Sequence, residues 1–180
     1  DAAIQPGPKT FDFNLQQYSI SAARDEAVDF SDPYYITAQA LVAFADSPVV
    51  AANTVADLQG YLLGAQIGTT SLDYIEEIIQ PDTPPAVYET NSDAKSGLEA
   101  GHVEALVFDL PTAYFITAVE IPEATIVGQL ETSEEQADRF GLLFADGSSL
   151  VPCVNEALAT LRTAGTLDAL AEEWLAQAGA

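Results

Sequence analysis

Basic side chains are scarce in this sequence, which makes Arg24 the first candidate for a residue that does chemistry. The 180 residues include five lysines and arginines against 28 aspartates and glutamates. Arg24 lies in the stretch YSISAARDEAVDFSDPYY, residues 18–35. A guanidinium presents a planar fork of N–H donors that matches the two oxygens of a carboxylate. We therefore expect Arg24 to bind an anionic ligand; the alternative is a surface arginine paired with Asp25 or Glu26.

The elements that position this arginine are predicted to be a strand and a short helical turn. Phe11, Phe13 and Leu15 recur at every second position, a pattern typical of one buried face of a strand. That strand is expected to end near Ser19. Ser21 is then placed to cap the turn that carries the arginine, with backbone N–H groups nearby that favour an anion.

Two further places in the chain could hold the rest of a small ligand. The turn Gly68-Thr69-Thr70-Ser71 lies between a predicted strand and a predicted helix, so its backbone N–H groups and the Thr70 hydroxyl could bind an anion. Asp109 ends the apolar run VEALVFD, at the carboxyl edge of the predicted sheet, where open α/β sheets bind ligands. For both places the alternative is a plain helix cap.

The three sites make chemical sense together. Arg24 and Thr70 would bind a carboxylate and Asp109 would bind an ammonium, which is the complement of a free α-amino acid. Support for an enzyme is weaker. His102, the only histidine, is expected to be exposed, and Cys153 is expected to be a small packed residue on a helix. The sequence has no G-x-S-x-G, P-loop, H-E-x-x-H or EF-hand motif, so we expect no metal and no cofactor.

Composition excludes several classes of partner. The net charge of −23 would repel nucleic acids and anionic membrane surfaces. No apolar stretch reaches the roughly 18 residues that span a bilayer. A single cysteine rules out an internal disulfide and a multi-cysteine zinc site, but it does not decide the compartment.

Strand and helix patterns alternate through the chain, which predicts an α/β fold with a mainly parallel sheet covered by helices. The strands are expected at about residues 39–45, 61–67, 86–89, 103–108, 125–130 and 139–145. The helices are expected at about 54–60, 71–80, 93–100, 111–119, 150–163 and 167–176. The last two are predicted to be amphipathic, with Leu158 and Leu161 on one stripe and Leu167, Leu170 and Trp174 on the other.

Four blocks of the sequence resemble one protein family. SISAARDEAVDFSDPYY is similar to the SIT-x-x-R-x-x-x-V-D-F-S-x-P-Y block of the family 3 solute-binding proteins, which supply amino acids to ABC transporters. DLQGYLLGAQIGTTSLDYI, LEAGHVEALVFDLPTAYF and residues 137–174 resemble three further blocks of that family. The resemblance implies a ligand site made of Arg24, Ser19 and Thr70 on the α-carboxylate, with Thr69 in the same turn, Asp109 on the α-ammonium, and the backbone carbonyl of Gln17.

The resemblance also implies a two-lobe fold of the type II periplasmic binding proteins, with the ligand between the lobes. The first lobe would comprise residues 1–37 and 138–180 and the second residues 38–137, joined by crossovers near 35–38 and 131–139. The family's opening strands and helices are missing, so the first lobe is expected to be incomplete. The chain is then expected to pair with a separate N-terminal fragment or with itself.

The function implied by the resemblance is extracytoplasmic binding of a polar L-amino acid, with hinge closure of the lobes and delivery to the membrane subunits of an ABC importer. The precursor would carry a signal peptide, and the mature protein would lie in the periplasm or be lipid-anchored at the outer face of the cytoplasmic membrane. The alternatives are an enzyme similar to cyclohexadienyl dehydratases and a ligand-binding sensor ectodomain.

Overall fold

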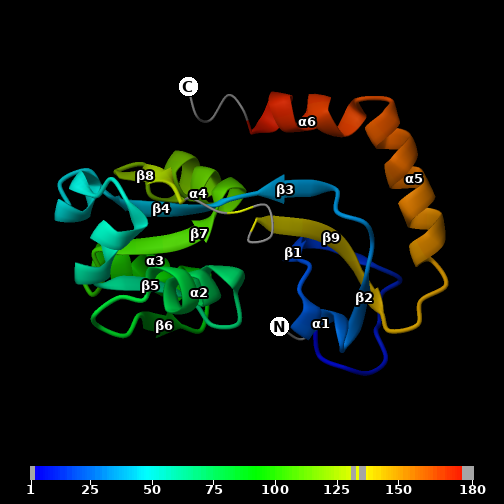
Figure 1. The fold of residues 1–180 in the computed structure, drawn as a ribbon, viewed down its shortest axis with the longest axis horizontal. Helices are drawn as coiled ribbons and strands as arrows, with labels where there is room; N and C mark the ends of the chain where they lie inside the picture. The colour runs from blue at the N-terminus through cyan, green and yellow to red at the C-terminus, as the bar shows by residue number, and fades with distance from the viewer. Residues whose placement is uncertain (1–2, 131–132, 134–136, 176–180) are drawn as a thin grey trace. The chain divides into compact units, whose positions relative to one another are not determined.

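The chain divides into two compact units in the computed structural model (Figure 1). Unit 1 comprises residues 1–36 and 138–180, and unit 2 comprises residues 37–137. The structure describes residues 3–130, 133 and 137–175. The crossover predicted near 131–139 therefore includes residues 131–132 and 134–136, which lie outside the described residues.

Unit 2 is built on a five-stranded sheet. Its strands are β4 (Gln39–Phe44), β5 (Leu63–Gln66), β6 (Ala86–Tyr88), β7 (Ala105–Asp109) and β8 (Ala124–Gln129), in the order β6-β5-β7-β4-β8. β5 pairs parallel with β6 and with β7, whereas β4 pairs antiparallel with β7 and with β8. The prediction of a mainly parallel sheet was therefore wrong. A strand covered on both faces is apolar throughout, whichever way its neighbours run, so its composition does not record their direction.

The helical segments of unit 2 follow the strands. They are η1 (Pro48–Ala51), η2 (Val55–Gly60), α2 (Thr70–Tyr74), α3 (Asn91–Glu99) and α4 (Leu110–Phe115), and two π-helical segments, η3 (Ile75–Ile79) and η4 (Ile116–Glu120), continue α2 and α4. η1 and η2 are 3₁₀ helices. Thr54 and Asp57 form a reciprocal capping box at the start of η2.

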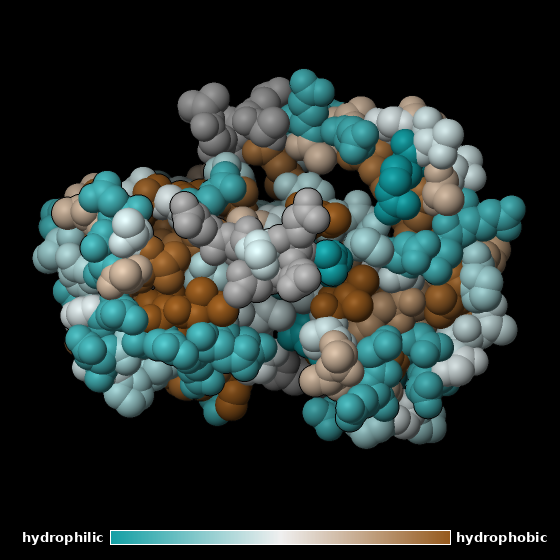
Figure 2. All heavy atoms as spheres, viewed as in Figure 1, coloured by the Kyte–Doolittle hydropathy of each residue, from teal (hydrophilic) through white to brown (hydrophobic). Residues whose placement is uncertain are grey.

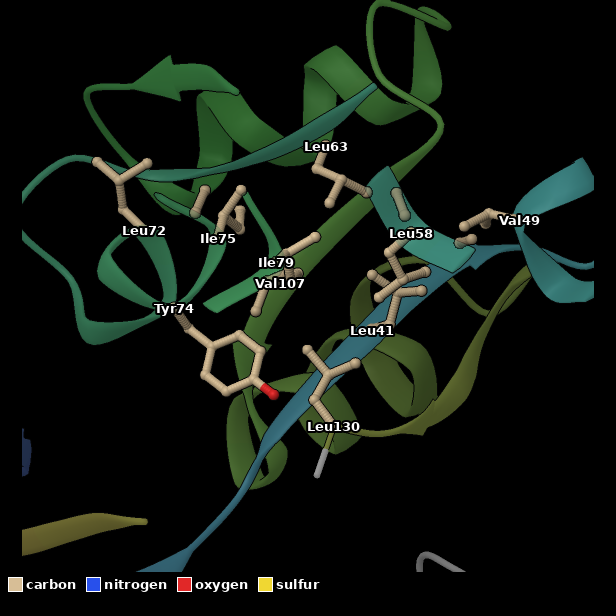
Figure 3. Packing of buried hydrophobic residues seen from close by; sticks show 13 residues of the cluster. Leu41, Val49, Leu58, Leu63, Leu72, Tyr74, Ile75, Ile79, Val107 and Leu130 are labelled. Carbon is tan, nitrogen blue, oxygen red and sulfur yellow. The ribbon is translucent and has the colours of Figure 1, made fainter. Parts of the chain in front are cut away.

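Alternate residues of the central strands face opposite sides of the sheet, and each side carries its own hydrophobic cluster. Leu41, Ala43 and Val107 pack with residues of α2, η3 and η2 on one side (Figure 3). Ala40, Val42, Leu106 and Phe108 pack with residues of α3 and α4 on the other. Unit 2 is thus a three-layer α/β unit with a sheet covered on both faces.

Unit 1 has a smaller, antiparallel sheet. β9 (Asp138–Ala145) lies between β1 (Asn14–Ser19) and β2 (Val28–Phe30), and β3 (Tyr35–Thr37) also pairs with it. The unit's helices are α1 (Ala22–Asp25), α5 (Val151–Thr163) and α6 (Thr166–Trp174). The cluster of this unit contains three buried residues, Val28, Phe30 and Leu143.

The first predicted strand is partly wrong. β1 begins at Asn14, and the side chains of Phe13 and Leu15 are 48% and 55% exposed instead of buried. The pairing register with β9 shifts between Asn14 and Tyr18, and Gln17 lies between them with a φ of 57°. A bulge of this kind interrupts the period of two on which the prediction depended.

The apolar faces of the two C-terminal helices, α5 and α6, are largely exposed instead of packed. Leu158 of α5 is buried, but none of the residues of α6 is, and the side chain of Trp174 is 70% exposed. Brown, hydrophobic atoms reach the surface along these helices in Figure 2. Cys153 is exposed on α5, so the expectation that it is packed was wrong. These faces lack a covering layer among the described residues of unit 1.

Candidate ligand-binding site

Arg24 lies in the short helix α1, and the N-cap of this helix is Ser21, as predicted. The side-chain oxygen of Ser21 accepts a hydrogen bond from the Arg24 N–H at 3.3 Å, at the start of α1. The guanidinium is half-buried, and its Nη1 donates to the backbone oxygen of Ser19 at 2.7 Å. A guanidinium carries five N–H donors in a planar fork, and this bond fixes the orientation of that fork.

The strand beneath the arginine fixes this carbonyl. Ser19 is buried and pairs with Phe140 of β9. The next residue, Ile20, donates its N–H to the Arg139 oxygen at 2.8 Å. Gln17 precedes them with a left-handed backbone, which is uncommon for a residue other than glycine. A bulge there turns peptide groups away from the regular ladder. The role of the Gln17 carbonyl in ligand binding stays a prediction.

Thr69 and Thr70 have different local roles. Thr69 is the N-cap of α2: its hydroxyl oxygen accepts from the Leu72 N–H at 3.2 Å and its hydroxyl donates to the Gln66 oxygen at 2.7 Å. Thr70 is the first residue of the helix, and its Oγ1 accepts from Nε2 of Gln39 at 3.4 Å. The cap alternative is thus realised by Thr69, while the Thr70 hydroxyl contacts the neighbouring strand β4.

Asp109 caps α4, which was the alternative to ligand binding. Its Oδ1 accepts from the Thr112 N–H at 2.9 Å and its Oδ2 accepts from the Thr112 hydroxyl at 2.7 Å. A carboxylate offers about four lone-pair positions, so a carboxylate that caps a helix can in principle also contact an ammonium. The two roles are therefore compatible.

One residue missed by the sequence analysis connects Thr70 with Asp109. Gln39 is the Cα partner of Asp109 in the β4–β7 pair, and its amide reaches Thr70 and Ser71. β5 and β7 are parallel, so the residues that follow them meet at one edge of the sheet. The signal was present in the sequence as a lone amide in the apolar run QALVAFA, but it was interpreted only as part of a buried strand.

The predicted residues therefore form two local groups. Arg24 and Ser19 are bonded to each other in unit 1, and Thr70 and Asp109 are connected through Gln39 in unit 2. That the two groups bind one ligand stays a prediction. His102 is exposed, as expected.

Neither a metal centre nor a membrane span emerges from the part of the chain that the structure describes. Among those residues, no three histidine, cysteine, aspartate or glutamate side chains are grouped so that they could hold a metal ion. None of the described helices is long and apolar enough to cross a membrane.

Comparison with known proteins decides the family. Residues 5–177 match the bacterial extracellular solute-binding proteins, family 3. The chain belongs to this family. As a family 3 solute-binding protein it is 27% identical over 168 residues to the L-cystine-binding protein TcyJ of Escherichia coli K12, and 26% identical over 172 residues to ABC transporter arginine-binding protein 1 of the same strain.

The match covers nearly the whole chain but only part of each relative. It includes 92% of this chain and 60% of TcyJ, and 94% of this chain and 68% of the arginine-binding protein. The chain thus spans about three fifths of the length of TcyJ.

Solved structures confirm the expected fold, that of the type II periplasmic binding proteins. A mutant of ArgBP from T. maritima is similar with a TM-score of 0.74 and 28% identity, over 93% of this chain and 70% of that one. The substrate-binding protein of an amino acid ABC transporter is similar with a TM-score of 0.73 and 29% identity, over 91% and 70%. Coverage of 70% agrees with a first lobe that is incomplete in this chain.

Proposed function

We propose that this family 3 solute-binding protein binds a free, polar L-amino acid outside the cytoplasmic membrane for delivery to an ABC importer. The observation that carries the proposal is the Arg24 guanidinium, held by the Ser19 carbonyl at 2.7 Å in the block that resembles the family's ligand-binding block. The family match and the relatives named for cystine and arginine support it.

Each end of the ligand has a chemical partner in this proposal. Arg24, with the Thr70 hydroxyl, takes the α-carboxylate through charge-assisted hydrogen bonds, and Asp109 takes the α-ammonium. Ser19, Gln17 and Thr69 shape the surroundings through their backbone or cap bonds. In this proposal residues of both units contact the ligand. The ligand therefore stabilises the closed conformation, in which the residues of both units reach it, and closure is a shift in the populations of the open and closed states.

The test is calorimetry on the protein as its gene encodes it, with a panel of free L-amino acids. We expect one or more polar members of the panel to bind and Arg24→Ala to lower that affinity by a factor on the order of 100, since charge-assisted hydrogen bonds are lost and a buried carboxylate is left unpaired. Arg162→Ala is the matched control, because Arg162 also lies in unit 1 and donates to a backbone oxygen, that of Pro33, at 2.6 Å.

The control variant should bind as the unmodified protein does. Equal affinities for the Arg24→Ala variant and the unmodified protein would overturn the assignment of Arg24. A panel in which no amino acid binds would overturn the proposed function itself.

Binding without catalysis is part of the proposal, because the named relatives are binding proteins. A dehydratase on this fold would consume prephenate or arogenate, and an absorbance assay with both compounds would detect that turnover. A sensor ectodomain would bind the same ligands but be encoded with a membrane-spanning signalling module, which the gene sequence would reveal. The proposed location is the periplasm or a lipid anchor at the outer face of the cytoplasmic membrane; the family description, extracellular solute-binding proteins, supports a place outside that membrane, and the anchor stays a prediction.

We further propose that unit 1 associates through its uncovered apolar faces, either with a separate polypeptide that completes the first lobe or with a second copy. Leu161, Leu170 and Trp174 are large and 40% or more exposed. Apolar side chains grouped at a surface mark interaction sites. Sedimentation velocity of the chain alone should show concentration-dependent association, weakened in a Leu170→Ser, Trp174→Ser double variant. A monodisperse monomer over the concentration range would contradict this.

A further inference from the structure

We propose that Gln39 is a positioning residue of the amino-acid site: its buried amide holds the Thr70 hydroxyl so that the hydroxyl hydrogen serves the ligand carboxylate. This inference rests on the proposed function and adds a residue to it. Neither the sequence motifs nor the named relatives assign a role to this glutamine.

Gln39 lies between the two candidate ligand-binding residues of unit 2, Thr70 and Asp109. It is the first residue of β4, it is 3% exposed, and its Cα partner on β7 is Asp109. Residues directly opposite each other in an antiparallel pair project to the same face of the sheet. Gln39 therefore starts beside Asp109, on the side of the sheet from which its amide reaches α2.

Both ends of the amide are bonded to consecutive residues of α2. The Ser71 hydroxyl donates to Oε1 of Gln39 at 2.7 Å, and Nε2 of Gln39 donates to Oγ1 of Thr70 at 3.4 Å. A buried amide that loses such partners carries a large desolvation cost. Ser71 is itself buried, so the bond between its hydroxyl and Oε1 keeps the amide from turning over.

The direction of these bonds sets what Thr70 can offer a ligand. A hydroxyl has one hydrogen to donate, and because the Thr70 oxygen accepts from Gln39, this hydrogen is not used in that bond and would point to the ligand in the proposed complex. A carboxylate is an acceptor only. The amide of Gln39 thus makes Thr70 a donor toward an anion. A glutamate at this position would accept from Thr70 instead and would place a negative charge near the ligand carboxylate.

The experiment measures the affinity of the protein, as its gene encodes it, for the amino acid that binds most tightly in the panel. We expect Gln39→Leu to weaken binding about tenfold, the size of one hydrogen bond to a charged group. Gln39→Glu should weaken it further, because it reverses the bond and adds charge. Affinity for the α-carboxamide of the same amino acid, which lacks the carboxylate, should change less in Gln39→Glu.

A double-mutant cycle separates positioning from a structural role. Gln39→Leu made on a Thr70→Val background should cost no further affinity, because the residue through which Gln39 acts is already gone. Gln59→Leu is the matched control: this glutamine also lies in unit 2, but its Nε2 donates to the Ile79 oxygen at 3.1 Å. Its affinity should equal that of the unmodified protein.

Two results would overturn the inference alone: unchanged affinity in Gln39→Leu, or the same loss with and without the Thr70 hydroxyl. Failure of the unmodified protein to bind any amino acid would overturn the proposed function as well, so the two failures are distinguishable. Circular dichroism melts accompany each variant. If Gln39→Leu does not fold, Ser71→Ala takes its place, because it removes the bond to Oε1 of Gln39. Ser71→Ala must then weaken binding when Thr70 is present and leave it unchanged in the Thr70→Val variant.

Discussion

Gly97 of α3 has no side chain because Tyr88 occupies the space that one would need. A Cβ built on Gly97 would lie 2.2 Å from the Tyr88 hydroxyl oxygen and 2.6 Å from its Cζ. Partial burial also raises the pKa of the Tyr88 phenol above its ordinary value, because desolvation disfavours the charged phenolate. The contact joins α3 to the edge strand β6.

We predict that Gly97→Ala destabilises the protein in spite of the higher helix propensity of alanine. Overpacking costs about 1–3 kcal/mol, and the propensity gain of about 1 kcal/mol offsets only part of it. Urea unfolding at neutral pH would measure the difference. Gly60→Ala is the control, since a Cβ there meets nothing within 4 Å. Equal stability of the Gly97 variant and the unmodified protein would show that Tyr88 moves aside freely.

At the residue scale, the sequence predicted the roles of side chains that bond to residues a few positions away in the chain. Ser21 was predicted as a cap because a cap acts within three residues, and the structure confirms it. The contact of Gln39 with Ser71 spans 32 positions, and its pairing with Asp109 depends on the order of strands. Such a contact leaves no local pattern, which is why the amide was missed.

At the scale of elements, η2 depends on a single acid. The Asp57 carboxylate accepts from the N–H groups of Asn53 at 3.0 Å and Thr54 at 2.9 Å, and the Thr54 hydroxyl oxygen accepts from the Asp57 N–H at 3.3 Å. The backbone bond from Asn53 is the largest cause that lowers the pKa of Asp57, followed by the side-chain and backbone bonds of Thr54. The charged form is thus the one that caps the helix.

We predict that Asp57→Asn destabilises the protein most at neutral pH. The folded pKa of Asp57 lies below its ordinary value of 3.8, so its contribution is fully present above that value and is lost as pH falls through the folded pKa. The difference in unfolding free energy between the two proteins should therefore narrow below about pH 4. Urea unfolding at pH 7, 5 and 3 would test this, and a difference independent of pH would contradict it.

Elements were predicted well where one segment determines its own pattern. The helices after β5 and β7 lie where the sequence predicted them, at about residues 71–80 and 111–119. The direction of β4 and the exposure of Phe13 were not predicted, because both depend on partners elsewhere in the fold. The alternation of Phe13 and Leu15 indicates a strand with one apolar face. Whether that face is buried depends on residues elsewhere in the fold that pack against it.

At the scale of the whole molecule, the two units differ in how much apolar surface they bury. The sheet of unit 2 carries one cluster of thirteen buried residues on one face and one of twelve on the other. Among the described residues of unit 1, the cluster contains three, Phe140, Phe144 and Leu158 are buried outside it, and α6 buries none of its residues. Hydrophobic burial is the dominant favourable term in folding, so the free energy of local opening should differ between the units.

We predict that hydrogen exchange on the intact chain separates the two units. Amides of β4 and β7, whose side chains pack on both faces of a sheet, should exchange on the order of tenfold or more slowly than amides of β2 and α5, because local opening there exposes far less apolar area. Mass spectrometry of peptides from each unit measures this directly. If a second polypeptide or a second copy covers unit 1, its addition should slow exchange in α5 and α6 and leave β4 and β7 unchanged. Equal protection of both units in the chain alone would mean that the small cluster of unit 1 suffices to hold it folded.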